Sequence, residues 1–438
     1  MSLPGVSTVI KDRFYAVSRI DVPQGPKVLI IGRRTTADGT LDSQGNAIYS
    51  LDVHNVQSEK ELGLVFGPES DIVRGYLEAA AGGAPRISVI ALPADTTFNH
   101  SLGTISSSSY TSGGGLDLWG DLWAAAETAQ ADIIVPWGRG SATTDWDDHA
   151  TPATPGTVEF GFYADNHTDP TKSWARKVAT EVARITEESH PCIAVMGVKP
   201  WVGQTDISGG MTPGSVSTHL GLVNLIDRND ATIATPDAED DEHKMGTQGS
   251  YLSIVCAELK PAGYEDNYSW GWANGAATYA GYVSQLQVWS APTMKRIFKV
   301  EALRYVPTRT QQLALIEKGL VPVSLNFRAE VQWVDATTFA NDRSQYTRLT
   351  TVRIIHDAVQ VVRSIAQNYV GEAATLELRN AFETAITSGL MSMQKQGALL
   401  AADFTISYFP RESKAIVDLI LTPAFELRNI EIQVSVNL

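Results

Sequence analysis

The last ten residues alternate between polar and apolar side chains. The even positions are apolar, namely Ile430, Ile432, Val434, Val436 and Leu438, and the odd positions between them are polar. A period of two predicts a β-strand with one buried face. No turn or further strand follows to pair with it, so we expect this strand to join a sheet of its own chain or a sheet of a neighbouring copy. The pattern leaves both alternatives open.

Residues 3–10 carry a second short pattern of this kind. Val6, Thr8 and Ile10 share one parity after Pro4 and Gly5, which predicts an N-terminal β-arm. An isolated arm buries too little apolar surface to offset the conformational entropy lost when its backbone becomes ordered. We therefore expect each arm to need a partner strand, which would also satisfy its backbone hydrogen-bonding groups.

The middle of the chain alternates between short apolar runs and stretches with helical periodicity. The runs at 27–31, 86–92, 131–135, 192–198 and 251–257 predict strands, and the stretches at 71–81, 117–130, 171–188, 217–228 and 272–286 predict helices. The last of these helices is rich in small residues and can pack closely against a neighbour. This order predicts a parallel sheet covered by helices. Three long polar loops, at 93–115, 139–170 and 201–215, are expected to be surface insertions.

The pattern changes after Pro292. A short helix at 311–318 and two strand-like runs at 322–327 and 330–334 precede two long amphipathic helices. The first helix has Val352, Ile355, Val359, Val362, Ala366 and Tyr369 on one face, and the second, at 376–393, has Phe382, Ile386, Leu390 and Met393 on one face. Two further strands, at 404–408 and 415–421, predict a β-hairpin.

We therefore predict a multidomain chain that combines α/β and α+β architecture. The expected parts are an N-terminal arm at 1–20, an α/β body with loop insertions at 21–290, a C-terminal domain of two helices and a β-hairpin at 291–426, and a C-terminal arm at 427–438. The total length of 438 residues also favours more than one hydrophobic core.

Charge is distributed unevenly along the chain. The net charge is −15, yet residues 291–438 hold 16 Lys or Arg and 14 Asp or Glu, so the acidic surplus lies upstream. The acidic part would repel phosphate, and the balanced part has no basic stripe with interleaved aromatic residues, so we expect no nucleic-acid binding. An acidic, solvent-facing part joined to a neutral part that packs against other chains fits this distribution.

Composition and cysteine usage exclude further classes of protein. With 43% hydrophobic and 19% charged residues, the chain has the composition of a soluble globular protein. It has no apolar run long enough to cross a bilayer and no signal-peptide pattern, so we expect neither a membrane protein nor one exported by a cleaved signal. Cys192 and Cys256 lie in apolar, strand-like runs and are expected to be buried small hydrophobic residues rather than a disulfide or a metal pair.

The sequence contains no recognisable motif for nucleotide binding, nucleophilic catalysis or a paired-histidine metal site. The glycine run at 113–115 precedes a predicted helix and could cradle a phosphate, but it follows a Ser/Thr-rich loop rather than a strand, so a turn is favoured. Clusters of Asp or Glu with His at 145–149 and 239–243 could hold a hard cation. Their ligands are not spaced to surround an ion, so solvated loops are favoured. We expect no catalytic residue, metal or cofactor.

The C-terminal third also carries a series of short motifs. They are Val334-Asp335-Ala336, the run Tyr346-Thr347-Arg348-Leu349-Thr350-Thr351-Val352-Arg353-Ile354, Tyr369-Val370-Gly371-Glu372 and Leu378-Arg379-Asn380. In combination they resemble the C-terminal domain of contractile tail sheath proteins of myophages and related contractile injection systems. Pro4-Gly5-Val6 is similar to the opening of that family, and elsewhere only the α/β rhythm agrees. The family often has Pro after the Gly-Glu pair, where this chain has Ala373.

This resemblance implies a structural subunit, not an enzyme. Such subunits stack in hexameric rings around an inner tail tube and contract to drive the tube through a target cell envelope, in a virion tail assembled in the host cytoplasm. Their terminal arms add strands to the sheets of neighbouring subunits. The implied partners are further copies of the chain, the tail tube protein, and baseplate and tail terminator proteins, with no nucleic acid and no membrane.

Two hypotheses about function follow. In a sheath subunit the C-terminal domain would face the tube, and Arg379, Glu383 and Lys395 on its second helix are the expected tube contacts, although simple solvent exposure explains these charges equally well. Flexible connectors are then expected near residues 21–24 and 423–428. The alternative is a soluble α/β enzyme or nucleotide-binding protein with its ligand at the C-terminal ends of the parallel strands.

Overall fold

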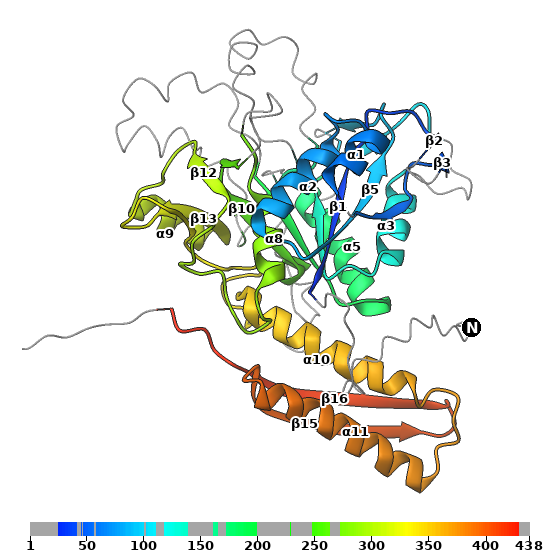
Figure 1. The fold of residues 1–438 in the computed structure, drawn as a ribbon. Coiled ribbons are helices and arrows are strands. Elements are labelled where there is room, and N and C mark those ends of the chain that lie inside the picture. Colours follow the sequence, from blue (N-terminus) through cyan, green and yellow to red (C-terminus); the bar gives the residue numbers. More distant parts are fainter. Residues whose placement is uncertain are drawn as a thin grey trace, which may run out of the picture. The chain divides into compact units, whose positions relative to one another are not determined.

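The computed structural model describes residues 25–41, 45, 47–56, 58–99, 102–110, 118–138, 161–164, 172–198, 228, 248–262 and 272–428. The chain forms two compact units. The first, here called the body, comprises Gly25–Gln287 and Ala291–Leu349. The second, here called the C-terminal unit, includes Val288–Ser290 and the described residues from Thr350 onward. Figure 1 shows the elements of both units.

The body is built on an eight-stranded sheet with the order β14-β13-β10-β9-β8-β1-β5-β4. The six inner strands are parallel, and an antiparallel strand closes each edge. The strands are β1 (Lys27–Arg33), β4 (Val53–Asn55), β5 (Arg86–Leu92), β8 (Ile133–Pro136), β9 (Ile193–Gly197), β10 (Leu252–Cys256), β13 (Leu320–Leu325) and β14 (Val331–Trp333). Parallel strands are buried on both faces, which explains why their sequences are continuous apolar runs.

Helices cover both faces of this sheet (Figure 1). The helices of the body are α1 (Glu59–Phe66), α2 (Asp71–Gly82), α3 (Leu118–Thr128), α5 (Trp174–Glu188), α8 (Ala276–Gln285) and α9 (Arg309–Glu317). On one face α3 and α5 bury Trp123 and Trp174 in the core cluster that also holds Leu29 and Ile31 of β1. On the other face α2 lies against Ile30 and packs beside α8.

The helices α2 and α8 approach each other backbone to backbone. A Cβ atom on Gly281 would lie 2.1 Å from the carbonyl oxygen of Ala79, and a Cβ atom on Gly82 would lie 2.1 Å from the carbonyl oxygen of Thr278. Only glycine fits at these two positions. The expected close packing of the small-residue helix is therefore confirmed.

Three short strand pairs complete the body. They are β2 (Thr40–Leu41) with β3 (Ala47–Ile48), β6 (Thr97–Asn99) with β7 (Thr104–Ser106), and β11 (Leu259–Pro261) with β12 (Val300–Leu303). The pair β6–β7 lies in the segment 93–115, which the sequence predicts as a loop, so this segment contains a short antiparallel strand pair. Beside it, hydroxyl groups of Ser107, Ser108 and Ser109 donate hydrogen bonds to the Asp95 carboxylate and hold the pKa of that carboxyl well below its usual range.

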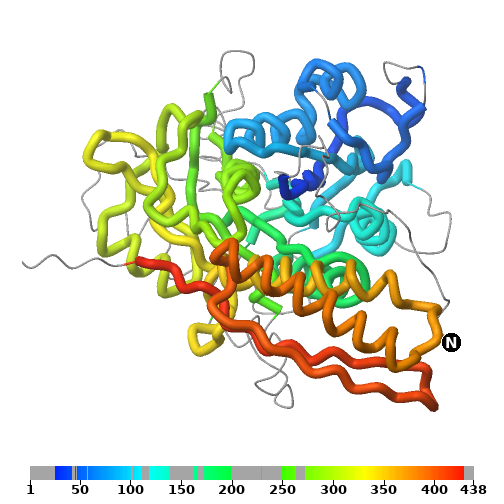
Figure 2. Tube along the Cα trace, turned by 60° about the horizontal axis from the view of Figure 1, so that its bottom comes forward, coloured from blue at the N-terminus to red at the C-terminus, as the bar shows by residue number. Residues whose placement is uncertain are grey.

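The C-terminal unit consists of two antiparallel helices on one face of a β-hairpin (Figures 1 and 2). Its elements are α10 (Leu349–Gln367), α11 (Leu376–Lys395), β15 (Leu399–Phe409) and β16 (Lys414–Pro423). The hydroxyl of Thr375 accepts a hydrogen bond from the backbone N–H of Leu378 and caps the start of α11. From there α11 buries Phe382, Ile386, Leu390 and Met393, which confirms its predicted apolar face.

The core face of α10 agrees with the predicted one in part: Val362 lies in the core of this unit, and Ala366 and Tyr369 pack against that core. Ile354, Ala358, Val362 and Ile365 lie in the core of the C-terminal unit, whereas Ile355 and Val359 are only half-buried. The helix carries apolar residues on two adjacent stripes, and periodicity alone does not decide which stripe meets the core.

The boundary between the two compact units lies later in the chain than the domain boundary predicted at residue 291. The strand pair predicted at 322–334 forms β13 and β14 and extends the sheet of the body, because β13 pairs in parallel with β10. The body therefore continues to Leu349. The predicted helix at 217–228 lies outside the described residues except for its last residue.

Candidate functional site

The β-hairpin of the C-terminal unit presents two long strands with regular pairing. Its register runs from Phe404↔Leu419 and Ile406↔Val417 to Phe409↔Lys414, with an irregularity near Leu399. The side chains of one face pack against α10 and α11. The opposite face carries alternating residues such as Asp403 and Ile420, which are exposed.

Both edges of this hairpin are open in the part of the chain that the structure describes. The sheet contains β15 and β16 and no third strand among those residues. Each strand therefore has one row of backbone N–H and C=O groups with no strand partner. A two-stranded sheet of this kind is marginal by itself and can accept an added strand along either edge.

The segment after β16 extends beyond the hairpin. The backbone N–H of Ala424 donates to the carbonyl oxygen of Ala398 at 2.9 Å, and the chain then has no regular structure as far as Arg428. Phe425 and Leu427 are exposed large apolar side chains in this segment. The predicted connector at 423–428 therefore begins with the last residue of β16 and continues as irregular chain.

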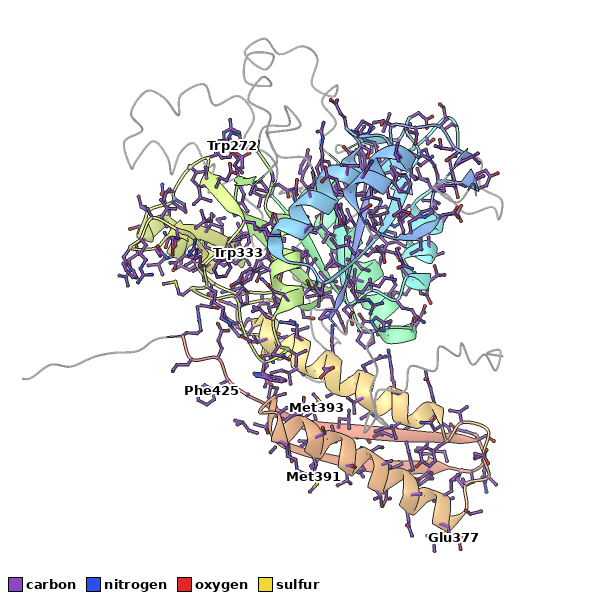
Figure 3. All side chains as sticks on the ribbon, in the orientation of Figure 1. Trp272, Trp333, Glu377, Met391, Met393 and Phe425 are labelled. Atoms are coloured by element: carbon purple, nitrogen blue, oxygen red, sulfur yellow. The ribbon has the colours of Figure 1, made fainter. Side chains whose placement is uncertain are left out.

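Two of the three predicted tube contacts lie together on α11. The guanidinium carbon of Arg379 lies 4.4 Å from the ring centroid of Tyr408 on β15. Burial and the neighbouring Glu383 raise the pKa of Tyr408, whereas Arg379 lowers it. Lys395 lies at the other end of α11, sixteen residues or about 24 Å further along the helix axis. The structure therefore brings Arg379 and Glu383 together and leaves Lys395 apart; Figure 3 shows the length of α11 between Glu377 and Met393.

The other predicted site residues lie outside the described part of the chain. These are Val6, Thr8 and Ile10 of the N-terminal arm and Ile430, Ile432, Val434, Val436 and Leu438 of the C-terminal arm. The glycine run at 113–115, both acidic clusters at 145–149 and 239–243, and the connector at 21–24 also lie outside it. Their predicted roles remain predictions.

The alternative hypothesis places a ligand where the strand order of the sheet reverses, between β1 and β8. In doubly wound sheets, ligand-binding crevices lie outside the C-terminal ends of such strands. Here Trp137, which follows β8, is fully buried and donates from Nε1 to Glu78 Oε2 at 3.2 Å. Its indole ring leaves no space for a Cβ atom on Gly75, which would lie 2.8 Å from Trp137 Cδ1. The indole is therefore packed tightly against α2 at the end of β8.

Charged residues after β1 also bind protein groups. Arg33 Nε donates to Asp71 Oδ2 at 2.9 Å. Arg34 is buried, and its Nη1 donates to Asp38 Oδ1 at 2.9 Å while its Nη2 donates to the Ala37 carbonyl oxygen at 2.7 Å. These contacts hold the loops at this end of the sheet and explain the arginines structurally.

In the described residues, neither the two cysteines nor any group of possible metal ligands supports the enzyme hypothesis. Cys192 and Cys256 are free and buried, which confirms the expectation of buried small hydrophobic residues. Burial raises the pKa of each thiol to about 12. The described ranges contain no group of three His, Cys, Asp or Glu side chains able to hold a metal ion. No helix in those ranges is long and apolar enough to cross a membrane.

Comparison with solved structures finds proteins whose fold is similar to that of this chain over its whole length. No protein-family model and no curated protein matches the sequence. Among solved structures, a chain of the anti-feeding prophage baseplate is similar with a TM-score of 0.58 at 13% identity, covering 100% of both chains. The contracted sheath complex of PVC, an extracellular contractile injection system, gives a TM-score of 0.56 at 13% identity over 99% of this chain and 98% of that one.

The structure of a sheath tail protein from Listeria innocua is also similar to that of this chain. Its TM-score is 0.53 at 10% identity, and the match covers 92% of each chain. The identities are low, so the likeness concerns the fold. The chain has the fold of contractile tail sheath proteins, as the motifs of its C-terminal third predict.

Proposed function

We propose that this chain is the structural subunit of a contractile tail sheath, with no catalytic role. The observation that carries the proposal is the fold match with the sheath complex of a contractile injection system over 99% of this chain and 98% of that one, together with the match to a chain of the anti-feeding prophage baseplate. The buried Trp137, which lies at the end of β8 beside the point where the strand order reverses, is consistent with the same conclusion.

In the proposed assembly the C-terminal arm of one copy adds a strand to the hairpin of another. The arm residues at 429–438 match the ten residues of β16 and the eleven of β15 in length. Its apolar side chains at every second position would continue the apolar face formed by Phe404, Ile406 and Leu419 over the two helices. Main-chain hydrogen bonds would supply the affinity of the arm for the hairpin, and the apolar side chains would fix the register of the added strand.

The N-terminal arm would use the second open edge. This arm, with Val6, Thr8 and Ile10, would pair with the hairpin strand that the C-terminal arm leaves free. Each hairpin would then form the centre of a four-stranded sheet to which several copies contribute strands. Stacked rings, which we propose to be hexameric, would be linked in this way around an inner tube. Contraction would re-pack the bodies while the strands stay paired, with rotation absorbed near residues 21–24 and 424–428.

The remaining partners follow from the same assembly. The C-terminal unit would face the tube, with Arg379 and Glu383 on one end of α11 and Lys395 on the other as contacts. Baseplate and terminator proteins would close the two ends of the sheath. The proposed location is a tail assembled in the host cytoplasm, which in a phage becomes part of the virion and drives genome ejection.

Negative-stain electron microscopy of the purified chain tests this function. The full-length protein is compared with a version ending at Leu427, which keeps every described element of the hairpin and removes the arm. We expect long hollow tubes from the first and only monomers or small oligomers from the second. Compact, monodisperse particles from both would contradict the sheath assignment, and tubes from both would remove the C-terminal arm from the interlock.

A further inference from the structure

A short segment in the middle of the chain belongs to the C-terminal unit by its packing. The body comprises Gly25–Gln287 and Ala291–Leu349, whereas Val288–Ser290, which lie between them in the sequence, group with the C-terminal unit. The chain therefore leaves the body after Gln287, adds three residues to the other unit and returns to the body at Ala291. We call Val288–Ser290 the strap.

Both flanks of the strap are held within the body. Before the strap, α8 ends at Gln285, whose Nε2 donates to the Gly82 carbonyl oxygen of α2 at 3.0 Å. After the strap, the backbone N–H of Met294 donates to the Trp333 carbonyl oxygen of β14 at 2.8 Å. The strap is therefore part of a short connection between two anchored points, which leaves it little conformational freedom once the body is folded.

Two side chains of the strap contribute to the core of the C-terminal unit. Val288 and Trp289 are half-buried and pack against the cluster formed by α10, α11 and the start of β15. Figure 3 labels Met393, one residue of this cluster. Residues 350–438 contain no tryptophan, so the strap supplies the largest side chain that packs there. The cluster has ten buried residues, compared with 33 in the body cluster of α3 and α5, so the loss of one side chain has a larger effect on it.

The hairpin depends on this small core for its order. Its inward-facing residues Phe404, Ile406 and Leu419 are only half-buried, although they pack against the core cluster. A two-stranded hairpin is marginally stable in water unless it packs against a helix or gains further strands. The helices α10 and α11 therefore hold the hairpin in the unassembled chain, and the side chains of the strap help to hold the helices.

We propose that the strap makes the order of the strand-accepting unit depend on a folded body. With Trp289 packed in place, the C-terminal unit is ordered and its hairpin accepts a strand of another copy; without it, the unit loosens. We call this arrangement the lock. Strand acceptance rests on the sheath function above, whereas the lock itself rests on packing within one chain. A chain whose body has not folded has no anchored strap, so the lock restricts strand exchange to completely folded subunits.

The first test measures amide hydrogen exchange in the unassembled full chain. It compares the wild type with W289A, with the milder strap variant V288A and with the control W119A. Trp119 on α3 is also half-buried but packs against the core cluster of the body, so the control makes the same substitution in the other unit. We expect W289A to speed the exchange of α11 and β15 amides at least tenfold and to leave α3 and β8 at their wild-type rates. W119A should give the reverse pattern.

Three results of this test would overturn the lock. They are unchanged exchange of α11 and β15 in both strap variants, an equal increase in the two units in both strap variants, and an effect of W119A on α11 and β15 as large as that of W289A. If W289A yields no folded protein, V288A decides. An increase of at least threefold confined to α11 and β15 then supports the lock, and any other pattern contradicts it.

The second test connects the lock with strand acceptance. Full-length wild type and W289A are pelleted at a urea concentration where hydrogen exchange shows the body folded in both and the C-terminal unit folded only in the wild type. We expect tubes from the wild type and at least tenfold less pelleted W289A, because only chains with an ordered acceptor take up a strand. Equal amounts of tubes would show that strand acceptance does not depend on the strap. If the wild type forms no tubes even without urea, the sheath function fails, and hydrogen exchange alone then decides on the lock.

Discussion

The body and the C-terminal unit differ in the edge strands of their sheets, whose unpaired backbone groups can pair with another chain. The body closes its sheet with short antiparallel strands, three residues each, and covers both faces with helices. The C-terminal unit leaves two strands of ten and eleven residues open along their outer edges, as far as the structure describes them. Short edge strands protect a sheet against pairing with other chains, and long open edges invite it. The sheet of the first unit ends in short edge strands, whereas the sheet of the second has long edges to which further strands can be added.

Amide hydrogen exchange should separate the two units most clearly. In unassembled protein we expect the outer-edge amides of β15 and β16 to exchange at least 100-fold faster than in assembled tubes, because added strands would protect them. Amides of β1 and β8 in the body should exchange at the same rate in both samples, since their hydrogen bonds are complete within the chain. Equal protection of the hairpin in both samples would contradict its role as an acceptor of strands.

The contact between α2 and α8 offers the largest expected loss of stability within the body. Gly281→Val would place its Cβ atom 2.1 Å from the Ala79 carbonyl oxygen and force the helices apart, so we expect a loss of about 3 kcal/mol or more in the free energy of unfolding. Gly63→Ala on α1 is the matched control, because its nearest neighbour lies at 3.7 Å, and it should be neutral or slightly stabilising. Urea titration of both variants measures the difference, and equal midpoints would refute the tight helix contact.

The core of the C-terminal unit should respond to the loss of one side chain on α11. Leu390 is 3% exposed and Met391, the next residue, is 52% exposed. Leu390→Ala is expected to cost about 2–5 kcal/mol of that unit's stability through lost burial and a cavity, whereas Met391→Ala should stay within about 0.5 kcal/mol. Near-ultraviolet dichroism and hydrogen exchange of the hairpin report on this unit. Similar effects of the two substitutions would mean that α11 presents a different face to the hairpin.

The contrast between the two units also explains what could be predicted from the sequence. The run at 86–92 forms β5 with the predicted limits, because a buried parallel strand is a continuous apolar run. Phe382, Ile386, Leu390 and Met393 were predicted as the buried face of α11 because a helix with one apolar stripe has one way to pack. Both features are local, and each depends on residues within one element.

Features that depend on distant residues were not predictable in the same way. The runs at 322–327 and 330–334 were correctly predicted as paired strands, but their membership of the body sheet depends on β10, since Leu320 pairs with Ile254, 66 residues earlier in the chain. The core stripe of α10 was predicted only in part, because two adjacent stripes are apolar and only Val362, Ala366 and Tyr369 of the predicted stripe meet the core. The exposure of Phe327 carries no sequence signal, since a phenylalanine there looks like a core residue until the turn between β13 and β14 is known. The proximity of Arg379, Glu383 and Tyr408 likewise follows only from the packing of α11 on β15.

The smallest effect is expected from a thiol reagent on the native body. Burial raises the pKa of Cys192 and Cys256 to about 12, above their ordinary value of 9.0, so at pH 8 neither thiol should react with Ellman's reagent until the body unfolds, when both should react. The raised pKa also means that the unfolded chain loses these protons first, so the thiols' contribution to stability is complete below about pH 9 and declines as the pH rises toward 12. A C192A/C256A variant should show a shallower loss of stability over that interval. Rapid labelling of the native protein at pH 8 would contradict this prediction. It would show that the core of the body opens often enough to expose the buried thiols.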